Sequence, residues 1–370
     1  MTLWDQAKLH HSKNLPFVLY KRPRESYVNG VFQNDDELNR VADFTEQGFI
    51  FSPFNAEDQP PVLIKFDVVL QGTFDVDRSK TICEPINDHS NDLEFVRYLE
   101  MVDKAVSVIN SNKIKKVVLS RSLEVNVTKS NFDIFNDIIQ IYDNAFCYLW
   151  HHPGVGTWMG ATPEVLLKCN GNRFTTMALA GTQVVKENSC NPKWGDKELY
   201  EQQLVTDYIV AVLEPQVQNI TVGEVESSKA GNLWHLRTKI SGIFQKEHFG
   251  KLIKSLHPTP AVCGIPLQAS KDFILKNENY KRSFYTGYLG ELNLLKELSR
   301  NKNPRNNENS VYKSVTNTSE LFVNLRCIQR IGNKAIIYVG GGITQGSDAK
   351  KEWVETVNKS FTMLRILKGI

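Results

Sequence analysis

Two pairs of glutamates share the same spacing in segments with helical periodicity. Glu352 and Glu355 follow the glycines at 340–342, and Glu198 and Glu201 open the segment DKELYEQQLVTDYIVAVL. Residues three apart lie on one face of a helix, so each helix would present two carboxylates side by side. Adjacent carboxylates repel each other unless a cation lies near, and Mg²⁺ prefers oxygen ligands. The alternative is two solvent-exposed acidic faces, since charged side chains are mostly exposed.

The glycines at 340–342 separate a predicted strand from the second acidic helix. The run AIIYV at 335–339 is short, apolar and rich in β-branched residues, which predicts a buried strand that ends where the glycines begin. Glycines at that point either form a tight turn or let the backbone approach an anionic ligand closely.

Three further residues are candidates for proton transfer. Lys116 begins the apolar strand KVVLSRSLEVNV, where it is either a charge that protects a sheet edge or a general base. Glu164 follows a proline in GATPEVLL, so a constrained turn either projects its carboxylate into a cleft or is capped by it. His235 in GNLWHLRTKISGIF is either a buried, hydrogen-bonded histidine or part of a site.

Composition narrows the class of protein. The 370 residues are 41% apolar and carry a net charge of only +3, which gives no field to attract nucleic acid or an acidic membrane surface. The six cysteines are scattered without a CxxC motif, which is typical of free thiols in a reducing compartment. No segment reaches the roughly twenty apolar residues of a membrane span. We expect a cytoplasmic protein with no nucleic-acid or membrane partner.

The elements that must position these residues alternate between strands and helices. Residues 1–90 are predicted to be β-rich, and 91–370 carry the motifs, with helices at 91–110 and 131–142 and a β-meander at 147–180. LFVNLRCIQR is predicted to be one strand. The polar residues 296–320 are predicted to be a mobile hairpin insertion without a core of its own. Antiparallel meanders interrupted by helices indicate an α+β fold, and we expect 1–370 to be a single domain.

Ten short motifs carry a family resemblance. In order, they are KVVLSR, GATPEVLL, LAGT, ELYEQQLV, LWHLRT, LHPTPAVCG, RSFYTGYLGEL, LRC, GGGI and KEWVETVNKS. This series, from about residue 91 to the C-terminus, closely resembles the chorismate-utilising enzymes (anthranilate synthase component I-like), and among them the isochorismate synthases. The resemblance implies an aminodeoxychorismate synthase-like fold, in which antiparallel sheets pack together with helices on the outside.

The resemblance also implies roles for individual residues. It places Mg²⁺ on Glu201 and Glu355, with Glu198 and Glu352 supporting through waters. Lys116 would be the general base for a water, Glu164 the general acid, and His235 would orient the leaving group or Glu164. Residues implied to hold or line the substrate are Arg326, Gly340, Gly341, Lys359, Thr182, Ala261 and Tyr285.

The implied reaction is Mg²⁺-dependent addition of water at C2 of chorismate and loss of the C4 hydroxyl, giving isochorismate for menaquinone or siderophore synthesis. In this family, direct ammonia addition goes with a glutamine at the position of Lys116, and aminodeoxychorismate enzymes carry a nucleophilic lysine at that of Ala180. We therefore expect a monomer without an amidotransferase subunit. The alternatives are a salicylate synthase, which also eliminates pyruvate, and a chorismate-binding regulator without catalysis.

Overall fold

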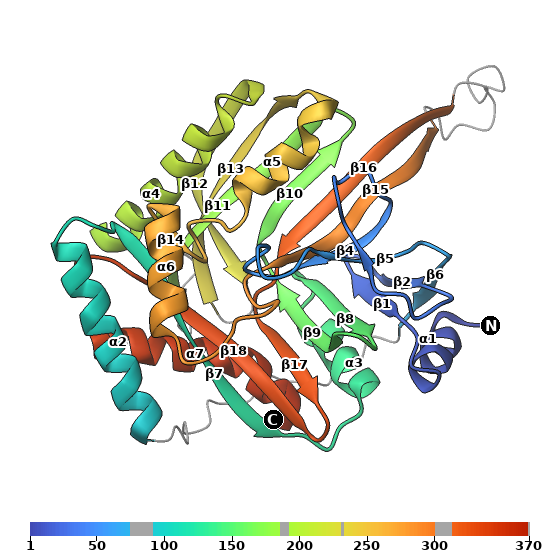
Figure 1. The fold of residues 1–370 in the computed structure, drawn as a ribbon, viewed down its shortest axis with the longest axis horizontal. Helices are drawn as coiled ribbons and strands as arrows, with labels where there is room; N and C mark the ends of the chain where they lie inside the picture. Colours follow the sequence, from blue (N-terminus) through green and yellow to red (C-terminus); the bar gives the residue numbers. More distant parts are fainter. Residues whose placement is uncertain (75–91, 186–191, 231–232, 300–312, 369–370) are drawn as a thin grey trace.

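Two antiparallel sheets of nine strands each pack face to face in this computed structural model, which describes residues 1–74, 92–185, 192–230, 233–299 and 313–368 (Figure 1). The first sheet has the strand order β14-β7-β18-β17-β9-β8-β1-β2-β6. Its strands are β1 (Phe17–Lys21), β2 (Tyr27–Phe32), β6 (Val68–Thr73), β7 (Lys116–Asn126), β8 (Phe146–His152), β9 (Gly156–Thr162), β14 (Gly264–Ile265), β17 (Cys327–Ile331) and β18 (Lys334–Ile343).

The second sheet has the order β12-β13-β11-β10-β16-β15-β4-β5-β3. Its strands are β3 (Asn39–Arg40), β4 (Gly48–Ser52), β5 (Val62–Ile64), β10 (Val165–Asn170), β11 (Arg173–Val184), β12 (Val217–Ala230), β13 (Leu233–Phe244), β15 (Tyr288–Ser299) and β16 (Lys313–Val323).

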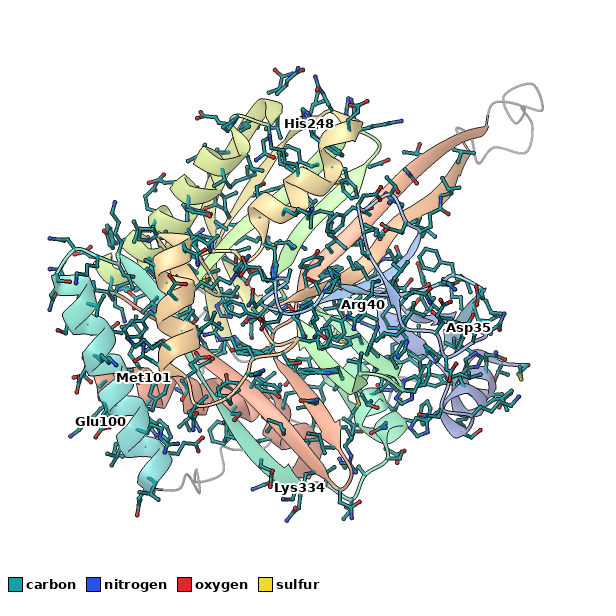
Figure 2. The ribbon with its side chains drawn as sticks, in the orientation of Figure 1. Asp35, Arg40, Glu100, Met101, His248 and Lys334 are labelled. Atoms are coloured by element: carbon teal, nitrogen blue, oxygen red, sulfur yellow. The ribbon has the colours of Figure 1, made fainter. Side chains whose placement is uncertain are left out.

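Strand β8 shows why the sheets pack in this way. All seven of its residues are buried, and successive side chains point to opposite faces. Phe146 and Trp150 enter the core between the sheets, where Phe146 stacks on Phe322 of β16 with ring centroids 4.1 Å apart. Cys147 and Leu149 enter the core beneath the helices. In the sequence, a strand buried on both faces is an apolar run without alternation. Side chains fill the space between the ribbons (Figure 2).

Helices cover the outer faces of both sheets (Figure 1). Apolar residues of α3 and α7 pack on the first sheet, and those of α4 and α5 pack on the second. The remaining core joins α2, α6 and the start of α7. The helices are α1 (Leu3–Ser12), α2 (Asp92–Asn110), α3 (Asn131–Ile141), α4 (Asp196–Leu213), α5 (Phe249–Leu256), α6 (Leu267–Asn277) and α7 (Ala349–Lys368). The predicted α+β class, with antiparallel sheets inside and helices outside, is confirmed.

The prediction that a strand ends at Gly340 is wrong. Strand β18 continues through all three glycines to Ile343, and Gly340, Gly341 and Gly342 pair with Ser120, Leu119 and Val118 of β7. Glycine disfavours strands when considered alone, but here each glycine lies in a continuous ladder of hydrogen bonds. Pairing also removes the edge-strand interpretation of Lys116, because β7 lies between β14 and β18.

The described ends of the polar stretch 296–320 pair with each other in antiparallel fashion, as expected of a hairpin. Residues 296–299 and 313–320 belong to the paired strands β15 and β16, and 300–312 lie outside the described residues. The single strand predicted for LFVNLRCIQR is two strands, because the chain turns between β16 and β17, where Arg326 has a φ of +47°. Helices α1 and α6 and strand β12 were not predicted.

The structure bears on two predictions, the state of the cysteines and the absence of a membrane-spanning helix. The four described cysteines, Cys147, Cys169, Cys263 and Cys327, are buried free thiols, as expected; Cys83 and Cys190 lie outside the described residues. No helix in the described part of the chain is long and apolar enough to cross a membrane.

Candidate active site

Most of the predicted site residues line one cavity of about 610 Å³ where the two sheets meet α4 and α7. Ten of them contribute to its wall: Glu164, Thr182, Glu201, His235, Ala261, Tyr285, Arg326, Gly340, Glu355 and Lys359. A second cavity, of about 750 Å³, lies near Phe244 and Phe249 and includes none of the predicted residues. Because the predicted site residues line the first cavity, we take it as the candidate active site, although the second has more empty space.

Lys116 lies directly behind the wall of this cavity. Its side chain has no exposed surface, and its Nζ is 2.8 Å from Oε1 of Glu201 on α4. Burial alone would raise the pKa of Glu201, but Lys116, Lys359 and Lys197 outweigh burial and leave that pKa lowered. Glu201 is thus an ionised carboxylate facing the cavity.

The glutamates of α7 are paired with lysines in the same way. Glu355 Oε1 lies 2.6 Å from Lys359 Nζ, which also donates to the Gly340 carbonyl at 2.8 Å. Glu352, only 2% exposed, accepts from Lys197 Nζ of α4 at 2.6 Å. Burial and the neighbouring Glu355 raise the pKa of Glu352, and Lys197 opposes this rise. Each of these two acids therefore has one ammonium group beside it, and the Glu352–Lys197 pair joins α7 to α4.

Glu198 has a different position from the other three acids. Its Oε2 accepts a hydrogen bond from the backbone N–H of Gly195 at 3.0 Å, so the carboxylate caps the first turn of α4. It does not line the cavity. The spacing of Glu198 and Glu201 was correctly predicted to be helical, but a carboxylate at a helix N-terminus also has a local capping role that spacing cannot distinguish from a ligand.

The glycines of β18 make room for these acids. A Cβ built on Gly342 would lie 2.4 Å from Glu201 Oε1 and 3.2 Å from Lys116 Cε, so any side chain there would displace the pair. A Cβ built on Gly341 would lie 3.5 Å from both Glu352 Oε2 and Glu355 Oε1. The glycines thus serve close approach of side chains and not a turn.

Glu164 enters the cavity from the turn between β9 and β10. It is 2% exposed, and burial raises its pKa to about 8, against the opposing effects of Lys116 and Arg326. At neutral pH this carboxyl group is mostly protonated, which is the form that a general acid requires. Glu201 and Glu355, which also line the cavity, each have a lysine ammonium within ion-pair distance. Glu164 has none among the described residues.

His235 of β13 is held in one tautomer. Its Nδ1 donates to the Gly181 carbonyl at 2.9 Å, which leaves Nε2 without a proton and 3.4 Å from Nη2 of Arg326. Burial, and next the charge of Arg326, lower the pKa of His235 to about 3, so the ring is neutral. The register of β11 shifts between Ala180 and Gln183, and this bulge aims the Gly181 carbonyl at the ring. His235 is thus both a buried hydrogen-bonded histidine and part of the cavity wall.

Arg326 has few partners for a half-buried guanidinium. In the described part of the chain no carboxylate forms an ion pair with it, and its contact with His235 is long at 3.4 Å. It lines the cavity together with Tyr285, which stacks on Tyr338 with centroids 5.3 Å apart. A guanidinium in such a position can bind a carboxylate in a bidentate manner.

Three of the acids offer carboxylate oxygens to one region of the cavity wall. Among the described residues, no group of three or more His, Cys, Asp or Glu side chains is close enough to hold a metal ion as placed. Even so, carboxylate oxygens of Glu352 and Glu355 converge on Gly341, and that of Glu201 lies over Gly342 next to it. Carboxylates are the donors that Mg²⁺ prefers, and one or two suffice when water and substrate complete the shell. The donor set therefore fits Mg²⁺.

Sequence reasoning missed the lysine that pairs with Glu352. Lys197 is 155 positions away from Glu352 in the chain, and its neighbours gave no local signal of this contact. The helical pattern of α4 did place Lys197 near Glu198 and Glu201, but only the packing of α4 beside α7 shows its partner.

Known proteins resemble both the sequence and the fold. The family model described as chorismate binding enzyme matches residues 70–297, and a second model with the same description matches 310–365. The chain is 28% identical over 287 residues to the isochorismate synthase EntC of Escherichia coli. This alignment covers 74% of the chain and 67% of EntC. It is 26% identical over 303 residues to the isochorismate synthase MenF of Pasteurella multocida, covering 78% of this chain and 65% of that relative.

The solved structure of MenF, the menaquinone-specific isochorismate synthase from Escherichia coli, superposes with a TM-score of 0.72. The sequence identity there is 19%, and the alignment covers 95% of this chain and 88% of MenF, so this comparison shows a shared fold. The first family model alone spans more than half of the chain, and the cavity contains the residues expected from the motifs. The chain therefore belongs to the family of chorismate-binding enzymes.

Proposed function

We propose that this protein is an isochorismate synthase, which converts chorismate reversibly to isochorismate. The observation that carries the proposal is Glu164, a buried carboxyl group with a pKa of about 8 in a cavity that also has Lys116 behind its wall. An acid that keeps its proton at neutral pH, facing a site with a lysine, is suited to exchange of a hydroxyl group. The two matched relatives are named isochorismate synthases.

The proton transfers follow from these two groups. Lys116, which pairs as an ammonium with Glu201 in this structure, must first give up its proton. As the free amine it then accepts a proton from water while the water oxygen bonds to C2 of the ring. Glu164 gives its proton to the C4 hydroxyl, which leaves as water while the ring double bonds shift. One water enters and one leaves, so the reaction is an isomerisation, and the same groups in exchanged roles catalyse its reversal. His235, neutral and fixed by Gly181, would orient the leaving group or Glu164.

Chorismate carries two carboxylates, and the cavity offers separate cationic groups for them. Arg326 would hold one carboxylate, and Lys359, with the backbone around Gly340 and Gly341, would lie near the other. Thr182, Ala261 and Tyr285 would form the wall around the ring. Magnesium, held by Glu201 and Glu355 with Glu352 beside them, would neutralise the ring carboxylate.

The choice of water as the attacking molecule rests on two positions. Lys116 stands where relatives that add ammonia have a glutamine, and Ala180, a lining residue without a nucleophile, stands where the aminodeoxychorismate enzymes have a lysine. We therefore propose activity without an amidotransferase subunit. The isochorismate would serve menaquinone or siderophore synthesis.

The test is a product assay on the purified protein with chorismate and Mg²⁺. We expect chorismate to fall to an equilibrium mixture with isochorismate, and no pyruvate to form. Pyruvate released with salicylate would replace the proposal with a salicylate synthase. Pyruvate released with an aminobenzoate, in the presence of glutamine and a glutaminase, would show that ammonia attacks. No conversion under any of these conditions would favour a chorismate-binding protein without catalysis.

A further inference from the structure

Tyr98 of α2 carries a hydroxyl group that its surroundings do not explain. The side chain is 2% exposed, and its ring packs against Trp353 of α7 with centroids 5.6 Å apart. The hydroxyl oxygen is buried and has no hydrogen-bond partner in the described part of the chain. Leaving a polar group buried and unpaired is unfavourable, and phenylalanine would fill the same space without that cost. The hydroxyl therefore needs a partner that the protein alone does not supply.

The hydroxyl faces the acids of α7. A Cβ built on Gly341 would lie 3.8 Å from the Tyr98 hydroxyl oxygen, 3.5 Å from Glu352 Oε2 and 3.5 Å from Glu355 Oε1. Three oxygens thus surround one point above a glycine, where no side chain enters. Packing of α2 on α7 creates this arrangement, and Figure 1 shows α2 beside α7 at the edge of the first sheet.

The chemistry of this space suits a hydrated cation. A tyrosine phenol keeps its proton at neutral pH, because its ordinary pKa is about 10. A neutral phenol can accept a hydrogen bond from a water molecule and donate one to a carboxylate. Water bound to Mg²⁺ is a strong donor, and Mg²⁺ usually keeps several waters when proteins bind it.

We propose that Tyr98 is a positioning residue for the magnesium site, where its hydroxyl holds a water of the hydrated ion against Glu352 and Glu355. The proposal rests on the magnesium binding included in the proposed function. Groups that act in this way, beyond the direct ligands, typically change metal affinity by about 10- to 100-fold when removed. Tyr98 would therefore tune metal affinity without touching the substrate.

The test compares Tyr98→Phe with the wild-type protein, both without substrate. Magnesium affinity is measured by calorimetric titration, and thermal unfolding is followed with and without Mg²⁺. We expect the magnesium dissociation constant of the variant to rise about 10-fold or more. Without Mg²⁺, its melting temperature should equal or exceed that of the wild type, because an unpaired buried hydroxyl has been removed.

Tyr148→Phe is the matched control. The Tyr148 hydroxyl is also buried, but it donates to Oδ1 of Asn324 at 2.5 Å, in the core between the sheets. Its removal should lower the melting temperature without Mg²⁺ and leave magnesium affinity unchanged. Tyr98→Phe is thus expected to weaken magnesium binding without lowering the melting temperature. Tyr148→Phe is expected to lower the melting temperature without changing magnesium binding.

Three outcomes would overturn the inference. If the wild type and Tyr98→Phe bind Mg²⁺ equally, the role of Tyr98 is wrong, while the magnesium site of the proposed function stands. If Tyr98→Phe loses as much Mg²⁺-free stability as the Tyr148 control, the hydroxyl already has a partner within the protein. If the wild type binds no Mg²⁺, both the inference and the proposed metal fail, and the product assay still decides the reaction.

Discussion

Two groups of ionisable residues meet at the cavity, and they differ in how their charges are compensated. The acid–lysine cluster consists of Glu201, Glu352 and Glu355 with Lys116, Lys197 and Lys359, in pairs 2.6–2.8 Å apart. The Glu164 group consists of Glu164, His235 and Arg326, whose closest polar contact with one another is the 3.4 Å between His235 and Arg326. Only the first group has opposite charges in direct contact.

The difference shows that burial alone does not decide the protonation state of a carboxyl group. Glu201 keeps a lowered pKa inside the protein because lysines surround it, whereas burial raises the pKa of Glu164 to about 8. The first group is suited to binding a cation or a substrate carboxylate. The second is suited to moving a proton, because its acid can exist in either form near neutral pH.

The largest expected effect is on the acid–lysine cluster. Glu355→Gln should remove essentially all turnover, because a metal site contributes several kcal/mol of stabilisation, which corresponds to about 1,000-fold or more in rate. Steady-state kinetics would measure the loss, with circular dichroism to confirm folding. Excess EDTA should abolish wild-type activity as well.

Glu198→Gln is the contrasting variant, because the structure places that carboxylate at the cap of α4 and outside the cavity wall. It should lose far less activity than Glu355→Gln. Equal losses would mean that Glu198 binds the ion, and full activity in excess EDTA would refute the metal assignment.

Lys116→Ala should lower kcat about 100- to 10,000-fold, the usual contribution of positioned proton transfer. Lys115→Ala is the matched control, because Lys115 is its exposed neighbour and should be replaceable without effect. Near-normal turnover of Lys116→Ala would leave Lys116 only the role of a counter-ion for Glu201.

The pH dependence should report on Glu164. Its protonated form is the general acid, and the fraction in that form falls above the pKa of about 8, so the forward rate should decrease about tenfold per pH unit beyond that value. A pH profile of kcat/KM from about pH 6 to 10 would measure this. Glu164→Gln should be inactive over the whole range, and a forward rate that keeps rising to the alkaline end would contradict the assignment.

The last expected effect concerns stability, and its sign differs between the two groups. The folded protein binds more protons than the unfolded chain between the ordinary glutamate pKa and about 8, so Glu164 reduces stability as the pH rises through that window. Glu164→Gln should therefore be more stable than the wild type at about pH 9, by an amount on the order of a few kcal/mol. Denaturant unfolding at about pH 5 and pH 9 would measure the difference.

Glu201→Gln should show the opposite sign, since its lowered pKa means that the ionised form stabilises the fold above the ordinary glutamate pKa. It should be less stable than the wild type at the same alkaline pH, and Lys116 would lose its partner. If both variants changed stability in the same direction, the distinction between the two groups would fail.

The sequence by itself determined much of the fold and predicted the candidate residues of the site. Periodicity placed Glu201, Glu352 and Glu355 on helices, because a helix of 3.6 residues per turn relates neighbours along the chain. The ordered motifs identified Glu164, His235 and Arg326 as a set, and all three line one cavity. These features were accessible because each depends on local order in the chain or on its resemblance to a family.

Only the tertiary structure decided how charges and oxygens pair across elements. Lys197 meets Glu352 from another helix, Tyr98 faces the same acid from a third, and the strand β18 runs through its glycines because β7 completes its hydrogen bonds. The raised pKa of Glu164 likewise comes from burial beneath segments distant in sequence. Contacts between elements depend on packing of the whole chain, and burial changes the energy of a charge far more than its neighbours in sequence do.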